Sequence, residues 1–139
     1  MHKAESRESI LIVDDDVEFS RSLQRTLCKA GFVSTLAHDA GEALHLLGTE
    51  SFDLVITDYQ MGRSSGLDVI SALRARLNRA KILLLSAFGD EEWTANPARL
   101  GADACLSKPV KRKAILDCIS RLLSNETTEV LNTQLKGGN

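Results

Sequence analysis

The feature that most constrains the fold is an alternation between short apolar runs and longer segments with helical periodicity. The runs at 10–13, 54–57 and 82–85 are almost continuously apolar. An unbroken apolar run of this length is typical of a strand that is buried on both faces. Two further strands are predicted at 32–37 and 102–107.

Amphipathic helices are predicted between these strands. In the segment 16–30, Phe19, Leu23 and Leu27 fall on one helical stripe, and Gly31 is placed to end that helix. Asp39 is a favourable N-cap for the next helix, which is expected to end at Gly48.

Three more helices are expected, at 67–77, between 90 and 100, and at 115–123. Pro97 disfavours a helix interior, so the fourth helix should be short or should restart with Asn96 as N-cap and Pro97 in its first turn. Five strands separated by five helices predict an α/β fold, in which a parallel sheet is covered by helices on both faces.

Length and charge limit the functions open to the chain. Its 139 residues fit one domain, and 17 basic against 19 acidic side chains give a net charge of −2. This balance argues against a chain that itself binds nucleic acid or an anionic membrane.

The polar leader at 1–8 lacks the apolar stretch of a signal peptide, and no apolar run approaches the roughly 20 residues of a membrane span, so a cytoplasmic protein is expected. The three cysteines have no CxxC spacing, which predicts buried thiols rather than a disulfide framework or a zinc site.

Polar residues stand where four of the predicted strands end. Ligands of parallel α/β sheets bind beyond the carboxyl ends of the strands. Asp14-Asp15-Asp16 follows the first strand, and Asp58, Ser86 and Lys108 follow the third, fourth and fifth. If the first and third strands are neighbours, at least three carboxylates converge there.

Two carboxylates about 4 Å apart repel by roughly 4 kcal/mol at an effective dielectric near 20. The cluster therefore requires a cation, for which Mg²⁺ and the ammonium of Lys108 are the candidates.

This set of groups favours phosphoryl transfer. Its transition state spreads negative charge over three oxygens, which Mg²⁺, Lys108 and Ser86 could each contact. Asp58 stands alone at its strand end and is the best candidate for a carboxylate nucleophile that forms an aspartyl phosphate. Asp16 is interpreted as the N-cap of the first helix.

Taken together, these residues resemble the receiver domain of two-component response regulators. The resemblance covers 9–124, with 125–139 as a tail or linker, and rests on motifs in sequence order. They are Ile-Leu-Ile-Val-Asp14-Asp15-Asp16, Asp58 followed by Met61 and Gly66, Ser86-Ala87, and Gly101-Ala102-Asp103 leading to Lys108-Pro109.

The resemblance implies a doubly wound, flavodoxin-like sheet of strand order 2-1-3-4-5 and a role for each site residue. Asp58 would be the phosphoacceptor, and Ser86 and Lys108 would contact the phosphoryl oxygens. Asp15, Asp58 and the backbone carbonyl of Gln60 would ligate Mg²⁺, which Asp14 would reach through water. The donor would be a phosphohistidine on a sensor histidine kinase or phosphotransfer protein. The domain would assist only its own phosphorylation and dephosphorylation, as a signalling module rather than an enzyme.

Two positions depart from the family pattern. Gly62-Arg63 stands where a proline commonly follows the methionine, and Cys105 stands where the fifth strand often carries an aromatic ring. Gly62 would loosen its loop, whereas Cys105, together with Pro97, bears on the usual output surface, from the fourth to the fifth helix, through which a homodimer or an effector domain would be contacted.

Other functions remain open at this stage. A haloacid-dehalogenase-type phosphatase would use Asp14-x-Asp16 as its nucleophile motif, which leaves Asp58 without a role. A pseudo-receiver would keep the fold as a docking module without phosphorylation. A flavin site is disfavoured because the aspartates would repel the cofactor phosphate.

Overall fold

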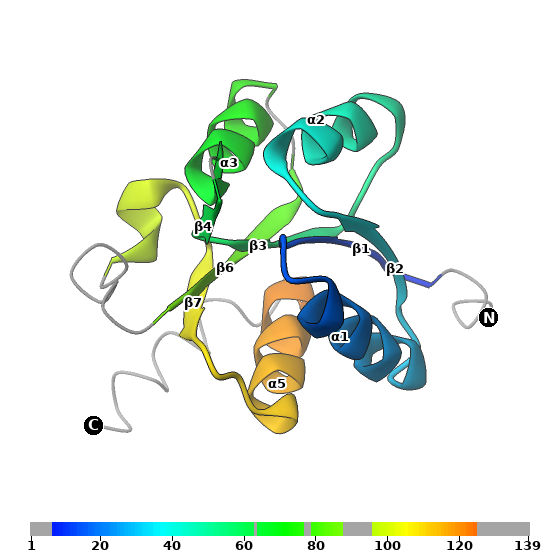
Figure 1. The fold of residues 1–139 in the computed structure, drawn as a ribbon. Coiled ribbons are helices and arrows are strands. Elements are labelled where there is room, and N and C mark those ends of the chain that lie inside the picture. The colour runs from blue at the N-terminus through cyan, green and yellow to red at the C-terminus, as the bar shows by residue number, and fades with distance from the viewer. Residues whose placement is uncertain (1–6, 63, 77–78, 88–95, 125–139) are drawn as a thin grey trace.

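The computed structural model describes residues 7–62, 64–76, 79–87 and 96–124. Its centre is a five-stranded parallel sheet of order β2-β1-β3-β6-β7 (Figure 1). The strands of this sheet are β1 (Ser9–Val13), β2 (Val33–Ala37), β3 (Leu54–Asp58), β6 (Lys81–Ser86) and β7 (Ala104–Ser107). The helices are α1 (Val17–Lys29), α2 (Ala40–Thr49), α3 (Gly66–Ala75), α5 (Arg112–Leu123) and the 3₁₀ helix η2 (Pro97–Leu100).

The strand order confirms the predicted doubly wound topology, because the five sheet strands in chain order are arranged 2-1-3-4-5. Helices α1 and α5 cover one face of the sheet, and α2 and α3 cover the other (Figure 1). A second, antiparallel pair, formed by β4 (Gln60–Met61) and β5 (Ser64–Ser65), lies between β3 and α3 in the chain. The sequence did not predict this short pair, which has two residues in each strand.

The core is divided by the sheet into two layers. Alternation along a strand sends successive side chains to opposite faces. Ile10, Ile12 and Ile56 accordingly pack in the layer that contains buried residues of α1 and α5, whereas Leu11 and Val55 pack in the layer that contains buried residues of α2 and α3. These side chains are at most 1% exposed, which agrees with the prediction of strands buried on both faces.

Side-chain caps fix the N-terminal ends of α1 and α2. The Asp16 carboxylate accepts a hydrogen bond from the Phe19 N–H at 3.0 Å, which confirms its interpretation as an N-cap. The Asp39 carboxylate caps α2 in the same way through the Glu42 N–H, at 2.8 Å. Each cap satisfies an N–H group that the helix itself leaves without a partner.

Several boundary predictions need correction. Helix α2 continues through Gly48 to Thr49, because Gly48 has no positive φ and does not break the helix, whereas Gly31 does follow α1 with a φ of +98°. Strand β7 begins at Ala104 rather than at Ala102. Cys28 is exposed rather than packed inside, although all three cysteines are free.

The predicted five helices correspond to four α-helices and one 3₁₀ helix within the described ranges. Asn96 takes the N-cap position of η2 with Pro97 in its first turn, as the sequence predicted for a restart. The remainder of the expected fourth helix, at 90–95, lies outside the described residues. In the part of the chain that the structure covers, no helix is both long and apolar enough to span a bilayer.

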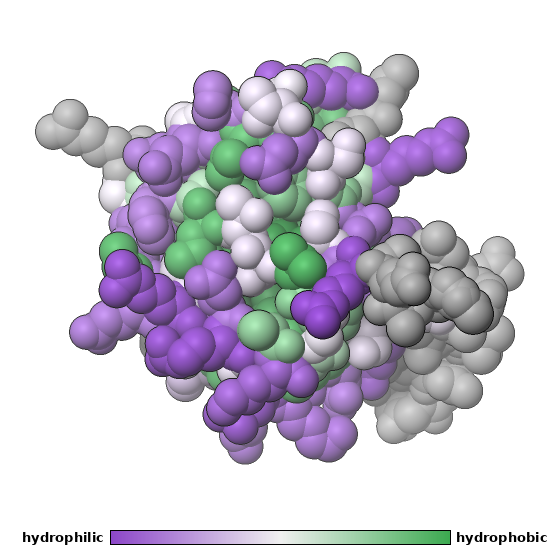
Figure 2. All heavy atoms as spheres, turned by 90° about the vertical axis from the view of Figure 1, so that its right-hand side faces the viewer, coloured by the Kyte–Doolittle hydropathy of each residue, from purple (hydrophilic) through white to green (hydrophobic). Residues whose placement is uncertain are grey.

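Strand β2 forms an edge of the sheet, and Figure 2 shows the corresponding side of the molecule. Hydrophobic residues are exposed across the middle of this face, with hydrophilic residues above and below them. Val33, at the start of β2, is 45% exposed. The edge position explains why β2 is less buried than β1, its neighbour in the sheet.

Gly66 fixes the distance between α3 and the end of β3. A Cβ at this buried position would collide with the backbone carbonyl oxygen of Asp58 and would stand 3.1 Å from Thr57 Oγ1. The Gly66 N–H also donates to the Tyr59 carbonyl at 2.9 Å. The absence of a side chain therefore lets the first turn of α3 pack directly on the backbone of Asp58.

We predict that Gly66→Ala lowers the free energy of unfolding by about 1–3 kcal/mol, since an overpacked contact with backbone cannot relax cheaply. Gly48→Ala is the control, because Gly48 is an exposed helical residue whose Cβ would meet nothing closer than Arg76 Nη1 at 3.9 Å. It should raise stability by about 0.5–1 kcal/mol. Urea unfolding measures both, and equal or higher stability of Gly66→Ala would contradict this account of the α3 packing.

Candidate functional site

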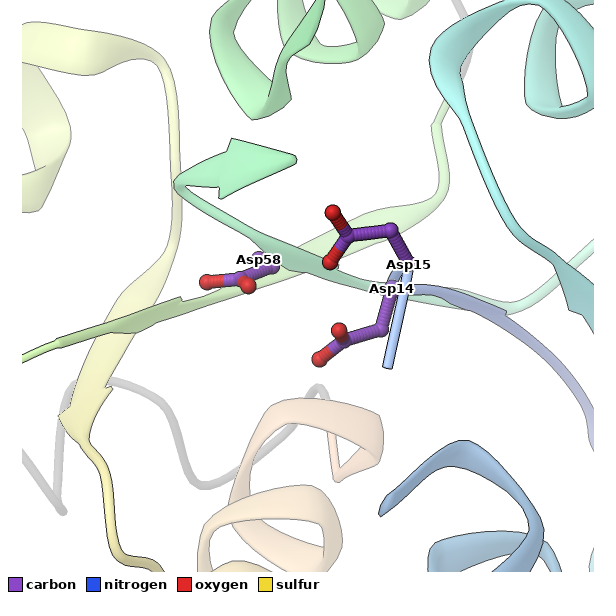
Figure 3. Close-up of side chains that lie close together, drawn as sticks. All are labelled: Asp14, Asp15 and Asp58. Atoms are coloured by element: carbon purple, nitrogen blue, oxygen red, sulfur yellow. The ribbon is translucent and has the colours of Figure 1, made fainter. Parts of the chain in front are cut away.

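The acidic site forms where two central strands end side by side. Val13 pairs with Thr57, so the next residues, Asp14 and Asp58, emerge together at the carboxyl edge of the sheet. Figure 3 shows the carboxyl groups of Asp14, Asp15 and Asp58 around a common space beyond β1 and β3. One oxygen from each of the three lies within 4.8 Å of the others. The predicted convergence of carboxylates is therefore present in the structure.

Lys108 joins this cluster from the fifth strand of the sheet. Its Nζ lies 2.7 Å from Asp14 Oδ2 and 3.3 Å from Asp58 Oδ2. The backbone N–H of Lys108 donates to the Ser86 carbonyl at 2.7 Å, which fixes the residue just beyond the end of β7. The ammonium also lies 4.4 Å from the centre of the Phe19 ring, a cation–π contact that the sequence analysis did not foresee.

Asp14 is the most constrained of the three acidic residues. It is 1% exposed, and its Oδ1 accepts a hydrogen bond from the Asp16 N–H at 2.9 Å while its Oδ2 pairs with Lys108. Its own N–H donates to the Ala37 carbonyl at 3.0 Å. A buried carboxylate needs such partners, because an unpaired charge in the interior is strongly disfavoured. Asp15, in contrast, is exposed.

The site perturbs two titratable groups. Burial raises the pKa of Asp58 above its ordinary value of 3.8; the ammonium of Lys108 opposes this rise and the carboxylate of Asp14 adds to it. For Lys108, burial acts to lower the pKa, but hydrogen bonding and attraction to Asp14 and Asp58 outweigh burial and raise the pKa. The lysine therefore stays charged and compensates a pair of like charges that would otherwise repel.

The loop after β3 borders the cluster. Gly62 has a φ of +58°, a left-handed conformation that favours glycine, and a Cβ there would stand 3.6 Å from Asp15 Oδ2. Proline, with φ fixed near −65°, could not adopt this conformation. Gln60, the exposed residue of β4, lies in the same loop and pairs with Ser65. The Gly-for-Pro departure thus coincides with a backbone conformation that proline forbids.

The side chain of Ser86 has a different neighbour. Ser86 ends β6, is fully buried, and its Oγ accepts a hydrogen bond from the thiol of Cys105 at a distance of 3.8 Å. The structure thus brings Asp14, Asp15, Asp58 and Lys108 together and places the Ser86 hydroxyl beside Cys105. Sequence reasoning missed this contact, although strand alternation could have indicated it.

The arrangement has the chemistry of a site for a hard cation and a phosphoryl group. Three carboxylates supply the oxygen ligands that Mg²⁺ prefers, and one partly exposed carboxylate, Asp58, is 13% accessible at the side chain. The ammonium of Lys108 lies within reach of the same oxygens. Such a set can neutralise a transferring phosphoryl group beside a carboxylate nucleophile.

Comparison with known proteins gives one consistent family. The family model described as the response regulator receiver domain matches residues 10–120. The chain is 35% identical over 109 residues to the acid tolerance regulatory protein ActR of Sinorhizobium medicae, an alignment that covers 78% of this chain and 56% of ActR. It is 36% identical over 114 residues to the transcriptional regulatory protein CpxR of Escherichia coli, with 82% of this chain and 48% of CpxR covered. The chain thus spans about half the length of these relatives.

Solved structures agree with this assignment. A CheY-like receiver domain protein from Methanospirillum hungatei superposes with a TM-score of 0.80 at 29% identity, covering 89% of this chain and 99% of that one. A response regulator from Burkholderia pseudomallei, solved with a phosphorylated aspartic acid, a calcium ion and citrate, gives a TM-score of 0.76 at 30% identity, covering 95% and 75%. By its matched residues, its fold and its relatives, the chain belongs to the receiver domains of two-component response regulators.

Proposed function

We propose that this receiver domain accepts a phosphoryl group on Asp58 and relays a two-component signal. The observation that carries the proposal is the cluster of Asp14, Asp15 and Asp58, closed by the ammonium of Lys108 at 2.7 and 3.3 Å from two of the carboxylates. A merely structural ion pair would not need a third carboxylate beside it. The proposed partner is a sensor histidine kinase or histidine phosphotransfer protein, and the proposed setting is the cytoplasm.

The transfer would proceed by attack of one Asp58 carboxylate oxygen on the phosphorus of a phosphohistidine. A new P–O bond forms as the P–N bond breaks, and the bonding electron pair stays on the imidazole nitrogen. The product is an acyl phosphate on Asp58. The positions of Lys108 and Asp58 support this step, because the ammonium lies close enough to Asp58 to contact an oxygen of a phosphoryl group bound there.

The donor set supports Mg²⁺ as the cofactor. Asp15, Asp58 and the Gln60 carbonyl would hold the ion and Asp14 would reach it through water, consistent with the close pairing of Asp14 and Lys108. When bound, the ion would supply charge neutralisation for the acyl phosphate and the carboxylates. The related Burkholderia pseudomallei protein was solved with a phosphorylated aspartic acid and a calcium ion, which lends support by similarity.

The phosphatase alternative has weaker support. Its nucleophile motif would include Asp16, but that carboxylate is engaged as the N-cap of α1. Asp58, which the phosphatase hypothesis leaves without a role, lies within the cluster instead. The observed geometry therefore favours the phosphoacceptor over the hydrolase.

We predict that incubation with acetyl phosphate and Mg²⁺ adds one phosphoryl group to the protein, which intact-protein mass spectrometry detects. Asp58→Asn should abolish the addition because the nucleophilic carboxylate is lost. Asp16→Asn is the matched control, since asparagine caps helices as well as aspartate does. Phosphorylation that persists in Asp58→Asn, or none in the parent protein, would refute the proposal.

A second prediction concerns the cation. Isothermal titration calorimetry on protein freed of metal should detect Mg²⁺ binding, and Asp15→Asn should weaken it by about tenfold or more because an exposed carboxylate ligand is lost. Asp16→Asn again serves as the control and should bind Mg²⁺ like the parent. Unchanged affinity in Asp15→Asn would remove Asp15 from the ligand set.

The raised pKa of Asp58 predicts a pH-dependent gain of stability in Asp58→Asn. A carboxyl group that holds its proton more tightly in the folded state than in the unfolded state destabilises the fold above its folded pKa. In buffer with a chelator, Asp58→Asn should therefore be more stable than the parent at neutral pH, and the difference should shrink as the pH falls through the folded pKa. Urea unfolding across this range measures the effect.

Asp117→Asn is the control for the stability prediction. Asp117 belongs to an exposed pair with Lys113 on α5, so its removal should change stability by less than about 0.5 kcal/mol, with little dependence on pH. A stability gain in Asp58→Asn that grows on acidification would contradict the assigned direction of the Asp58 shift.

A further inference from the structure

The hydroxyl of Ser86 and the thiol of Cys105 lie next to each other on the face of the sheet that α2 and α3 cover. Leu84 pairs with Cys105 and Ser86 with Ser107, so Ser86 and Cys105 are diagonal neighbours on adjacent strands. The thiol donates to Ser86 Oγ across 3.8 Å, and Ser86 is fully buried. The Cys105 thiol is therefore a direct neighbour of this hydroxyl in the structure.

Strand alternation places this hydroxyl on the opposite face of the sheet from the Asp58 side chain. Leu84 and Cys105 pack in the layer that contains α2 and α3, and strand alternation sends Ser86 to the same side. Asp58 pairs with Leu85, which packs in the other layer, the one with α1 and α5. To donate a hydrogen bond to a phosphoryl group on Asp58, the hydroxyl must give up its place beside the thiol.

We propose that Cys105 is a positioning residue that holds the Ser86 hydroxyl in a resting place, away from the phosphoryl site, and so slows phosphorylation. The inference rests on the proposed function, since it concerns how readily Ser86 reaches a phosphoryl group on Asp58. It assigns a task to the residue that departs from the family pattern in the fifth strand. A thiol is small and a weak donor, so this contact restrains the hydroxyl through a hydrogen bond and not through bulk.

The test is the second-order rate constant of phosphorylation by acetyl phosphate with Mg²⁺, followed by intact mass. Cys105→Ala removes the donor and should raise this rate constant about threefold, the size expected for one weak hydrogen bond. Cys105→Val, which also lacks a donor but fills the space of the thiol, should give a similar increase. Cys105→Ser keeps a donor and should return the rate toward that of the parent.

A double-mutant comparison shows whether Cys105 acts through Ser86. In a Ser86→Ala background, Cys105→Ala should have no further effect on the rate constant. An effect of the same size in both backgrounds would overturn the inference, as would parent-like rates for Cys105→Ala and Cys105→Val.

Cys118→Ala is the matched control, because Cys118 is another partly buried thiol and packs in the opposite layer, with α5. It should leave the rate constant unchanged, and an increase equal to that of Cys105→Ala would count against a specific role for Cys105. A parent protein that takes up no phosphoryl group refutes the proposed function itself. A parent that is phosphorylated, with Cys105 variants of equal rate, refutes only the role of Cys105.

Discussion

Repulsion among like charges is the constraint around which this molecule is organised. Asp14 and Asp58 emerge together because their strands pair in parallel register, and Asp15 follows at once in the chain. The positively charged ammonium of Lys108 contacts both Asp14 and Asp58. Its position depends on the last strand of the sheet, so the electrostatic balance of the site requires the complete sheet topology.

Packing of the core holds the charged groups of the site in position. The apolar side chains of β1 and β3 are at most 1% exposed and anchor both strands in the core, and Gly66 brings α3 against the backbone of Asp58. The Phe19 ring of α1 lies against the Lys108 ammonium, which also pairs with Asp14 after β1 and with Asp58 at the end of β3. The Asp58 carboxylate is thus held by the backbone of its own strand and paired with a lysine that follows a distant strand.

Much of the fold could be predicted from the sequence, because apolar runs, N-caps and strand-end polar residues are local signals. The pattern located the five strands, their parallel order by resemblance, and the convergence of Asp14, Asp15 and Asp58 with Lys108. Gly48 was misinterpreted because glycine favours a helix end where the backbone takes a left-handed conformation, which Gly31 adopts and Gly48 does not. The contact between Phe19 and Lys108 joins residues far apart in sequence, which no local pattern encodes.

The alternation of side chains along β6 has a wider consequence. Strand alternation sends the Asp58 side chain to the face of the sheet that α1 and α5 cover, and the Ser86 hydroxyl with its sulfur neighbour to the face that α2 and α3 cover. Under the proposal made for Cys105, substitutions beside Ser86 would change how fast the domain is phosphorylated and would leave the ion pairs of Lys108 in place. Two receiver domains with the same acidic cluster would then differ in their rate of phosphorylation through the residue that faces this serine.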